Sequence, residues 1–117
     1  MAKILVVEDE MFIADELKIS LKELGYTVLG PCNNGKDAFE IVKTCNPDLV
    51  LMDIEIEGEI DGIQTAEKIR YSFNTPVVFL TAYADDKTLD RASITQPYGY
   101  LLKPASDLEL RTTIELA

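Results

Sequence analysis

The chain has 117 residues, 47% of them apolar, which suits one domain with a genuine hydrophobic core. Its formal net charge of −10, from 11 basic and 21 acidic residues, argues against direct binding to nucleic acid or to an anionic membrane surface. The two cysteines, Cys32 and Cys45, lack C-x-x-C spacing, and there is no histidine, which argues against a zinc site. We expect both cysteines to be buried in a reducing compartment.

We expect a cytoplasmic protein, because the sequence shows no export signal and no membrane-spanning stretch. The N-terminus lacks the pattern of a signal peptide, and no apolar stretch approaches the ~20 residues that cross a bilayer. We expect a single domain over residues 1–117. Its last amphipathic segment still continues where the sequence ends, which leaves open a domain cut from a longer protein.

Five apolar runs predict five strands. Three are continuous and rich in branched residues, as expected of strands covered on both faces, and two are shorter. In chain order the five runs are Ile4–Val7, Tyr26–Leu29, Leu49–Met52, Val77–Leu80 and Gly99–Leu102.

Segments with helical spacing separate the strands. Apolar stripes predict helices that contain Phe12, Ile13, Leu17, Leu21 and Leu24, then Ala38 to Cys45, then Ile63, Ala66 and Ile69, then Leu89, Ala92 and Ile94, then Leu110, Ile114 and Leu116. Gly25 and Asn46-Pro47 are expected to end the first two, and Asp61 to cap the third. Ser106 and Glu109 match a capping box that opens the last.

This alternation predicts an α/β fold of the (βα)5 type. Right-handed crossovers make such a chain a doubly wound five-stranded parallel sheet, and the flavodoxin-like strand order 2-1-3-4-5 is the natural choice. That order places a ligand crevice at the carboxyl ends of the first and third strands. Glu8, Asp9 and Asp53 follow or close those strands, while Thr81 and Lys103 close the fourth and fifth.

The three acids at this edge point to a bound cation. Two unit negative charges ~4 Å apart repel by roughly 4 kcal/mol at an effective dielectric constant of 20, so the cluster must share protons or bind a metal. Mg²⁺ is the expected ion because all available ligands are oxygen atoms. Asp53 would then face a cation and the Lys103 ammonium, which suits a carboxylate that attacks a phosphoryl group. The Thr81 hydroxyl could add a hydrogen bond.

The chain resembles the receiver domain of bacterial and archaeal two-component response regulators. The matching stretches span nearly the whole chain in the expected order: Ile4-Leu5-Val6-Val7-Glu8-Asp9-Glu10, Leu51-Met52-Asp53-Ile54, Asp61-Gly62-Ile63, Phe79-Leu80-Thr81-Ala82 and Gly99-Tyr100-Leu101-Leu102-Lys103-Pro104. A motif set distributed in this way is far more specific than any one tripeptide.

The resemblance implies a role for each residue of the crevice. Asp53 corresponds to the phosphoacceptor and a magnesium ligand, Asp9 to a direct magnesium ligand, and Glu8 to an acid that acts through a metal-bound water. The backbone carbonyl of Glu55 would be a further ligand. Thr81 and Lys103 match the residues that contact the phosphoryl group, and Thr81 and Tyr100 match those that shift on activation. The Lys103-Pro104 bond is expected to be cis.

Three features depart from the commonest family pattern. Glu8 stands where Asp is more frequent, the segment from Ile54 to Gly62 lacks a common Pro and is one residue longer, and Ala105 replaces a frequent Phe. These changes keep the oxygen donors and the ammonium, but they alter the surface that a partner would read.

The resemblance also implies partners. A sensor histidine kinase or phosphotransfer protein would donate the phosphoryl group, and a downstream output domain or protein would read the altered surface of the last two helices and the fifth strand. A homodimer through this surface is compatible with the pattern. The chain would be a regulatory domain that catalyses only its own phosphorylation and slow dephosphorylation, not an enzyme with a separate substrate.

Three alternatives remain at this stage. A receiver-like interaction module without phosphate chemistry would have no need of the five crevice residues. A magnesium-dependent phosphatase with an Asp nucleophile would resemble the chain only at Asp53-Ile54-Glu55, and 117 residues leave no room for a cap domain. A flavin carrier would need a phosphate-binding loop where Glu8-Asp9-Glu10 stands.

Overall fold

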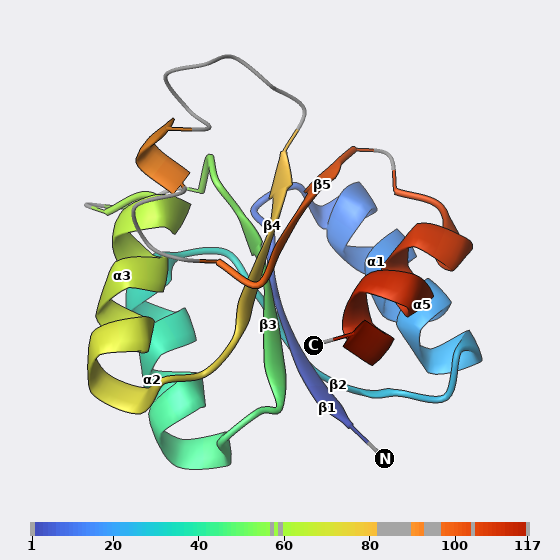
Figure 1. Cartoon of the computed structure of the whole chain (residues 1–117), viewed down its shortest axis with the longest axis horizontal. Coiled ribbons are helices and arrows are strands. Elements are labelled where there is room, and N and C mark those ends of the chain that lie inside the picture. Colours follow the sequence, from blue (N-terminus) through green and yellow to red (C-terminus); the bar gives the residue numbers. More distant parts are fainter. Residues whose placement is uncertain are drawn as a thin grey trace.

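The computed structural model describes residues 2–56, 58, 60–81, 90–92, 97–103 and 105–116 (Figure 1). Its five strands form one parallel sheet in the order β2-β1-β3-β4-β5, which confirms the predicted α/β class and strand order. The strands are β1 (Lys3–Val7), β2 (Thr27–Cys32), β3 (Leu49–Asp53), β4 (Val77–Thr81) and β5 (Gly99–Leu102).

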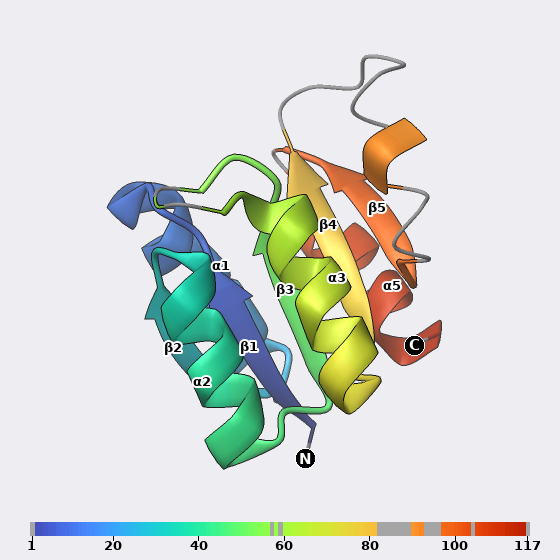
Figure 2. The ribbon, with the colours of Figure 1, turned by 90° about the vertical axis from the view of Figure 1, so that its left-hand side faces the viewer.

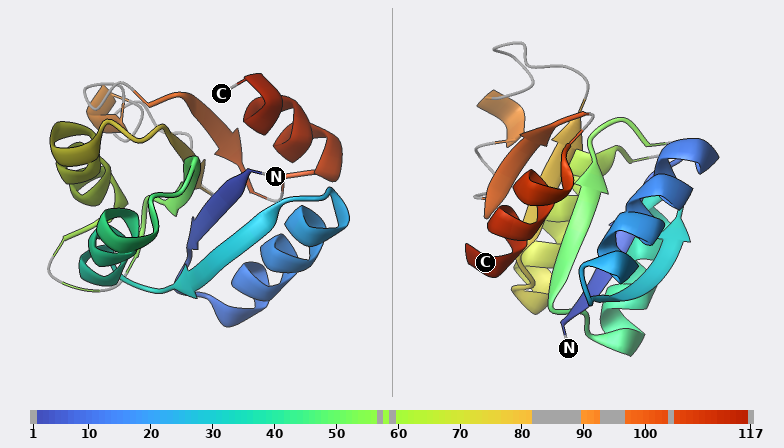
Figure 3. Two further views of the ribbon diagram at one scale, coloured as in Figure 1. Left: turned by 90° about the horizontal axis from the view of Figure 1, so that it is seen from below. Right: turned by 90° about the vertical axis from the view of Figure 1, so that its right-hand side faces the viewer.

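Helices cover both faces of the sheet. Figure 2 shows α2 and α3 side by side on one face, and the right panel of Figure 3 shows α1 and α5 on the other. The helices are α1 (Met11–Glu23), α2 (Gly35–Cys45), α3 (Gly62–Phe73) and α5 (Asp107–Leu116). No helix in the described part of the chain is long and apolar enough to cross a bilayer.

Alternation along the central strands divides the core into two clusters. Successive side chains of a strand point to opposite faces, so a continuous apolar run supplies both sides of a covered sheet. Leu5 and Val7 pack in the cluster under α2 and α3, whereas Ile4 and Val6 pack in the cluster under α1 and α5. The same division runs through β3 and β4. Because both faces of these strands are buried, these runs are apolar throughout and do not alternate between apolar and polar residues.

The predicted helix ends are confirmed at α3 and α5. The Asp61 side chain accepts a hydrogen bond from the Gln64 amide at 2.9 Å, and the Gln64 side chain accepts one from the Asp61 amide, also at 2.9 Å. Ser106 and Glu109 form the same reciprocal pair at 3.1 Å. Each pair satisfies backbone donors that a helix start leaves open.

The prediction that every residue of the apolar stripes faces the core was wrong at some positions. Phe12 is 86% exposed and Leu116 is 71% exposed, although both belong to the predicted stripes. At 3.6 residues per turn, two residues span about 200°, so Phe12 lies opposite the buried Ala14 and Leu116 lies opposite the buried Ile114. Cys45 is likewise exposed at the end of α2, and Cys32 is only half-buried, so the expectation of two buried cysteines was also wrong.

The second strand runs three residues beyond its predicted end. It continues through Gly30 and Pro31 to Cys32, with a shift of register against β1 between Leu5 and Val7. Proline is tolerated here because β2 is an edge strand. The extension places the Cys32 carbonyl where it accepts a hydrogen bond from the Glu8 amide at 2.9 Å.

Two expectations fall partly or wholly outside the described residues. Within the predicted fourth helix, residues 90–92 are helical and Ala92 is buried, but Leu89 and Ile94 lie outside the described part. The isomer of the Lys103-Pro104 bond also lies outside it, because Pro104 is not described.

The capping box of α5 makes a testable contribution to stability. Replacing Ser106 with Ala removes the acceptor for the Glu109 amide and should lower the free energy of unfolding by about 1 kcal/mol. Urea unfolding measures this change. Ser72→Ala is the matched control, because Ser72 is exposed in α3 and outside any cap, and it should change stability by less than about 0.5 kcal/mol. Equal effects of the two substitutions would contradict the capping role.

Candidate phosphoryl and metal site

Four strands deliver the candidate residues to the carboxyl edge of the sheet. Glu8 and Asp9 follow β1, Asp53 ends β3, Thr81 ends β4, and Lys103 follows β5. In Figure 2 the arrows of β1, β3 and β4 point toward the same edge. One carboxylate oxygen from each of Glu8, Asp9 and Asp53 lies within 4.8 Å of the others. The topology therefore assembles the acidic cluster that the spacing predicted.

The Lys103 ammonium joins two of these acids. Its Nζ atom lies 3.1 Å from Asp53 Oδ2 and forms a hydrogen-bonded ion pair with Glu8 Oε1. Both partners are buried, since Glu8 is 3% exposed and Asp53 is 5% exposed. An unpaired charge buried to this degree would be very unfavourable. Lys103 is therefore the counter-charge that allows the two acids to stay in the sheet edge.

One ammonium does not balance three carboxylates. Burial raises the pKa of Glu8, and the contact with Asp53 raises it further against the opposing effect of Lys103. Burial and the neighbouring Glu8 also raise the pKa of Asp9. Burial alone would lower the pKa of Lys103, but the hydrogen bond to Glu8 and the charges of both acids outweigh it and raise that pKa. The site thus favours additional positive charge.

Backbone hydrogen bonds hold the acids in position. The Glu55 amide donates to Asp53 Oδ1 at 3.1 Å, and the Glu10 amide donates to Glu8 Oε2 at 3.2 Å. The Lys103 amide donates to the Thr81 carbonyl at 2.8 Å, which aligns the end of β5 with the end of β4. Asp53 therefore keeps one oxygen toward a backbone donor and the other toward Lys103.

The remaining candidate residues lie at the rim or in the core. Thr81 is 1% exposed at the end of β4. Glu55 is exposed two residues after Asp53. Tyr100 is half-buried in β5, paired in register with Phe79 and packed against the cluster under α2 and α3. Tyr100 is therefore a partly buried aromatic residue of the sheet, and a rotation of its side chain would change how much of it is exposed to solvent.

Gly62 is a site residue whose role the sequence did not reveal. A Cβ atom built on Gly62 would lie 2.0 Å from the Asp53 carbonyl oxygen and 2.8 Å from the Ile54 Cα atom. The Gly62 amide donates to the Ile54 carbonyl at 2.8 Å. The start of α3 thus rests directly on the backbone of Asp53. The sequence signal was a glycine directly after a helix cap, but a close approach cannot be read from one chain.

Comparison with known proteins settles the family. The model of the response regulator receiver domain matches residues 4–115. The chain belongs to this family.

Curated relatives of this receiver domain are longer proteins. The transcriptional regulatory protein PdtaR of Mycobacterium tuberculosis is 36% identical over 115 residues, which cover 98% of this chain and 56% of the relative. The uncharacterized transcriptional regulatory protein YrkP of Bacillus subtilis is 42% identical over 114 residues, which cover 96% of this chain and 47% of the relative. The receiver domain described here thus spans about half the length of these relatives.

Solved receiver domains share the fold closely. The signal receiver domain of a modulated diguanylate cyclase from Desulfovibrio desulfuricans is 38% identical, with a TM-score of 0.95, 100% of this chain covered and 93% of the other. The N-terminal domain of a response regulator/sensory box/GGDEF protein from Carboxydothermus hydrogenoformans is 40% identical, with a TM-score of 0.88 and coverages of 97% and 91%.

The contact between Gly62 and Asp53 can be tested by adding one methyl group. Gly62→Ala forces either α3 or the Asp53 backbone to move, which should lower the free energy of unfolding by about 1 to 3 kcal/mol. Urea unfolding gives the free energy, and the amide chemical shifts of Asp53 and Ile54 report the displacement. In the control Gly99→Ala, the new methyl group would meet first a Thr113 methyl at 3.1 Å. A Gly62→Ala protein as stable as Gly99→Ala would refute the close approach.

Proposed function

We propose that this receiver domain is a signalling switch in which Asp53 accepts a phosphoryl group from a phosphohistidine. A sensor histidine kinase or a phosphotransfer protein would supply it. The observation that supports this best is the environment of Asp53, which is 5% exposed at the end of a central strand, 3.1 Å from an ammonium and grouped with two further acids. A carboxylate needed only for stability would not require that cluster. A histidine kinase takes its phosphoryl group from ATP, which is in the cytoplasm, and we propose this location for the chain.

The transfer step uses groups at the edge of the sheet. A carboxylate oxygen of Asp53 forms a bond to phosphorus while the bond between phosphorus and the histidine nitrogen breaks, and the electron pair returns to the imidazole. Lys103 would leave Asp53 to contact the phosphoryl oxygens, and its positive charge would offset the charge they carry. The Thr81 hydroxyl would donate a hydrogen bond to one of these oxygens.

The acidic cluster fits a magnesium ion. Asp9 and Asp53 would be direct ligands, Glu8 would act through a water, and the Glu55 backbone carbonyl would complete the protein's share of the ligands. All four donors are oxygen atoms, which Mg²⁺ prefers. When bound, the ion supplies the positive charge that three carboxylates and one ammonium lack and neutralises phosphoryl oxygens.

Phosphorylation would change the surface around β5 and α5. Thr81 would follow the phosphoryl group, and the half-buried Tyr100 would turn further inward into the space that opens beside β4. The output is then a shift between two populations, whose size depends on how differently they bind a partner. A downstream output domain or protein would read this surface, and a homodimer through it is compatible with the proposal.

Phosphotransfer to Asp53 is the direct test. The protein is incubated with acetyl phosphate and Mg²⁺, and its intact mass is followed. We expect the addition of one phosphoryl group, absent in Asp53→Asn and in samples with excess chelator. The matched control is Asp15→Asn, which removes an exposed carboxylate from α1 and should leave the addition unchanged.

Each other outcome points to a different function. Wild-type protein that never gains mass, with no phosphate released, would show an interaction module without phosphate chemistry. Continuous release of phosphate without accumulation would show a phosphatase. A mass gain that persists in Asp53→Asn would place the acceptor elsewhere.

Magnesium binding should appear as a change in stability. Because the pKa values of Glu8 and Asp9 are raised on folding, the folded chain binds protons more strongly, and its stability falls as the pH rises above their ordinary values. Mg²⁺ at ten times its Kd should raise the free energy of unfolding by about 1.4 kcal/mol at pH 7.5, measured as a rise in Tm. The same concentration should raise it less at pH 5, because protonated carboxyl groups bind the ion poorly. Asp9→Asn should abolish the rise, whereas Asp15→Asn should retain it. An equal rise in all three proteins would exclude the acidic cluster as the site.

A further inference from the structure

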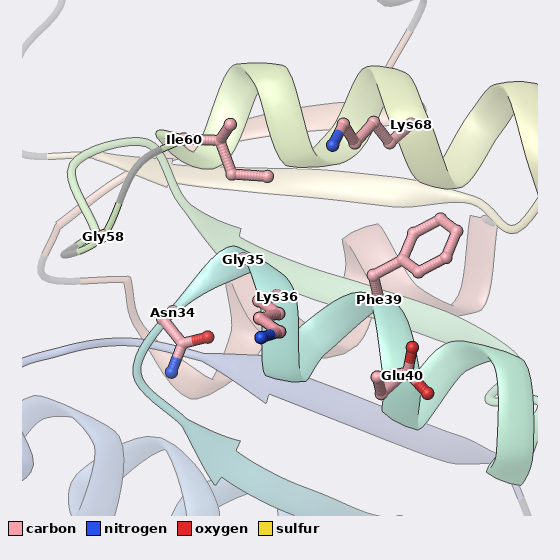
Figure 4. Close-up of a pocket in the computed structure, with 8 residues that line it drawn as sticks. All are labelled: Asn34, Gly35, Lys36, Phe39, Glu40, Gly58, Ile60 and Lys68. Atoms are coloured by element: carbon pink, nitrogen blue, oxygen red, sulfur yellow. The ribbon is translucent and has the colours of Figure 1, made fainter.

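A second hollow lies between α2 and α3, away from the acidic cluster (Figure 4). We call it the α2–α3 pocket and define it by Asn34, Lys36, Phe39, Gly58, Ile60 and Lys68, which line it together with Gly35 and Glu40. Its volume is about 460 Å³. Pockets that hold small molecules usually measure about 300 to 1,000 Å³, so this hollow has the size of a ligand site.

Two lysines line the pocket, although the chain as a whole is strongly acidic. Among the described residues, the charged side chains that line it are Lys36, Lys68 and Glu40, in a chain of net charge −10. Lys36 and Lys68 are exposed, and neither forms an ion pair with a carboxylate within the described residues. Two lysines that line one hollow and form no ion pair among the described residues are suited to an anion.

Apart from Asn34, the uncharged lining residues among those described are apolar, aromatic or glycine. Figure 4 shows the Phe39 ring reaching from α2 toward α3, and Lys68 extending along α3 in the direction of Ile60. The Phe39 ring packs against Phe73 with ring centroids 5.1 Å apart, which gives the hollow a firm wall. A neighbouring hollow shares Phe39, Ile60 and Lys68 and continues to Tyr71, which is 94% exposed. The two hollows together extend along α3.

The two helices are in close contact beside the pocket. A Cβ atom on Gly35 would lie 2.0 Å from Thr65 Oγ1, so α2 and α3 approach closely at this lining residue. The Asn34 side chain caps α2 by accepting a hydrogen bond from the Asp37 amide at 2.8 Å. That cap, and the Asp37 carboxylate in the first turn, would disfavour a phosphate dianion at this helix end.

We propose that the α2–α3 pocket binds a small organic molecule with an apolar body and a single negative charge, such as a hydrophobic carboxylate. Lys36 and Lys68 would bind the charged group, and Phe39 and Ile60 would contact the body. A ligand there would also contact Gly58 and Ile60, which belong to the segment between Asp53 and α3. The proposal needs only the pocket and does not depend on phosphorylation of Asp53.

The test uses two fluorescent probes that differ in charge. Anilinonaphthalene sulfonate has an apolar body and one sulfonate, and N-phenyl-1-naphthylamine has the same body without it. Fluorescence titration of the full chain should give at least about tenfold tighter binding of the sulfonate, because each hydrogen bond to a charged group contributes enough for about a tenfold change. The double variant Lys36→Gln/Lys68→Gln should lose this preference, and Glu40→Gln should bind the sulfonate more tightly.

The matched control is Lys22→Gln/Lys43→Gln, which removes the same charge from exposed positions outside the pocket and should bind like the wild type. Amide spectra locate the probe: Gly35 and Gly58 should shift, and Gly25 and Gly99 should not. No binding to the wild type, equal binding of both probes, equal loss in both double variants, or shifts confined to Ala105 and Leu110 beside the separate hollow near Lys103 would overturn the proposal.

Discussion

The ion pairs of Lys103 with Glu8 and Asp53 are the interaction on which the site depends. They join the ends of β1, β3 and β5 through one ammonium, and two of these ends hold carboxylates that are almost completely buried. Apolar packing alone would resist placing negative charges at this depth. The sheet edge tolerates these carboxylates because Lys103, directly after the last strand, supplies a positive charge. One ammonium does not neutralise three carboxylates, so the edge favours binding of a further cation.

The surrounding backbone turns this electrostatic arrangement into a defined geometry. The extension of β2 to Cys32 fixes the Glu8 amide, and the Glu55 amide orients one oxygen of Asp53. The start of α3 lies against the Asp53 carbonyl because Gly62 has no side chain. A displacement at either of the last two contacts would move Asp53. The same segment, from Asp53 to Gly62, also contributes to the pocket between α2 and α3, so both sites share one short piece of chain.

Several elements could be predicted closely because their signals are local. The three central strands, the cap at Asp61, the capping box at Ser106 and the strand order follow from apolar runs, short side-chain motifs and the handedness of crossovers. The errors occurred where a tertiary contact decides. Phe12 and Leu116 are apolar enough for a core. They are exposed because the face of each helix that packs against the sheet is the opposite one. The end of β2 depends on pairing with β1, which no local pattern contains.

The sequence by itself determined the alternation of strands and helices, the family, and the acids, hydroxyl and ammonium that close the strands. Their types and spacing are properties of the chain, and the carboxyl ends of parallel strands must share one edge. Only the tertiary structure decided that Lys103 pairs with Glu8 as well as Asp53, that α3 touches the Asp53 backbone at Gly62, and that two lysines line a hollow beside Phe39. Such contacts depend on distances between elements, and those distances are set by packing of the whole core.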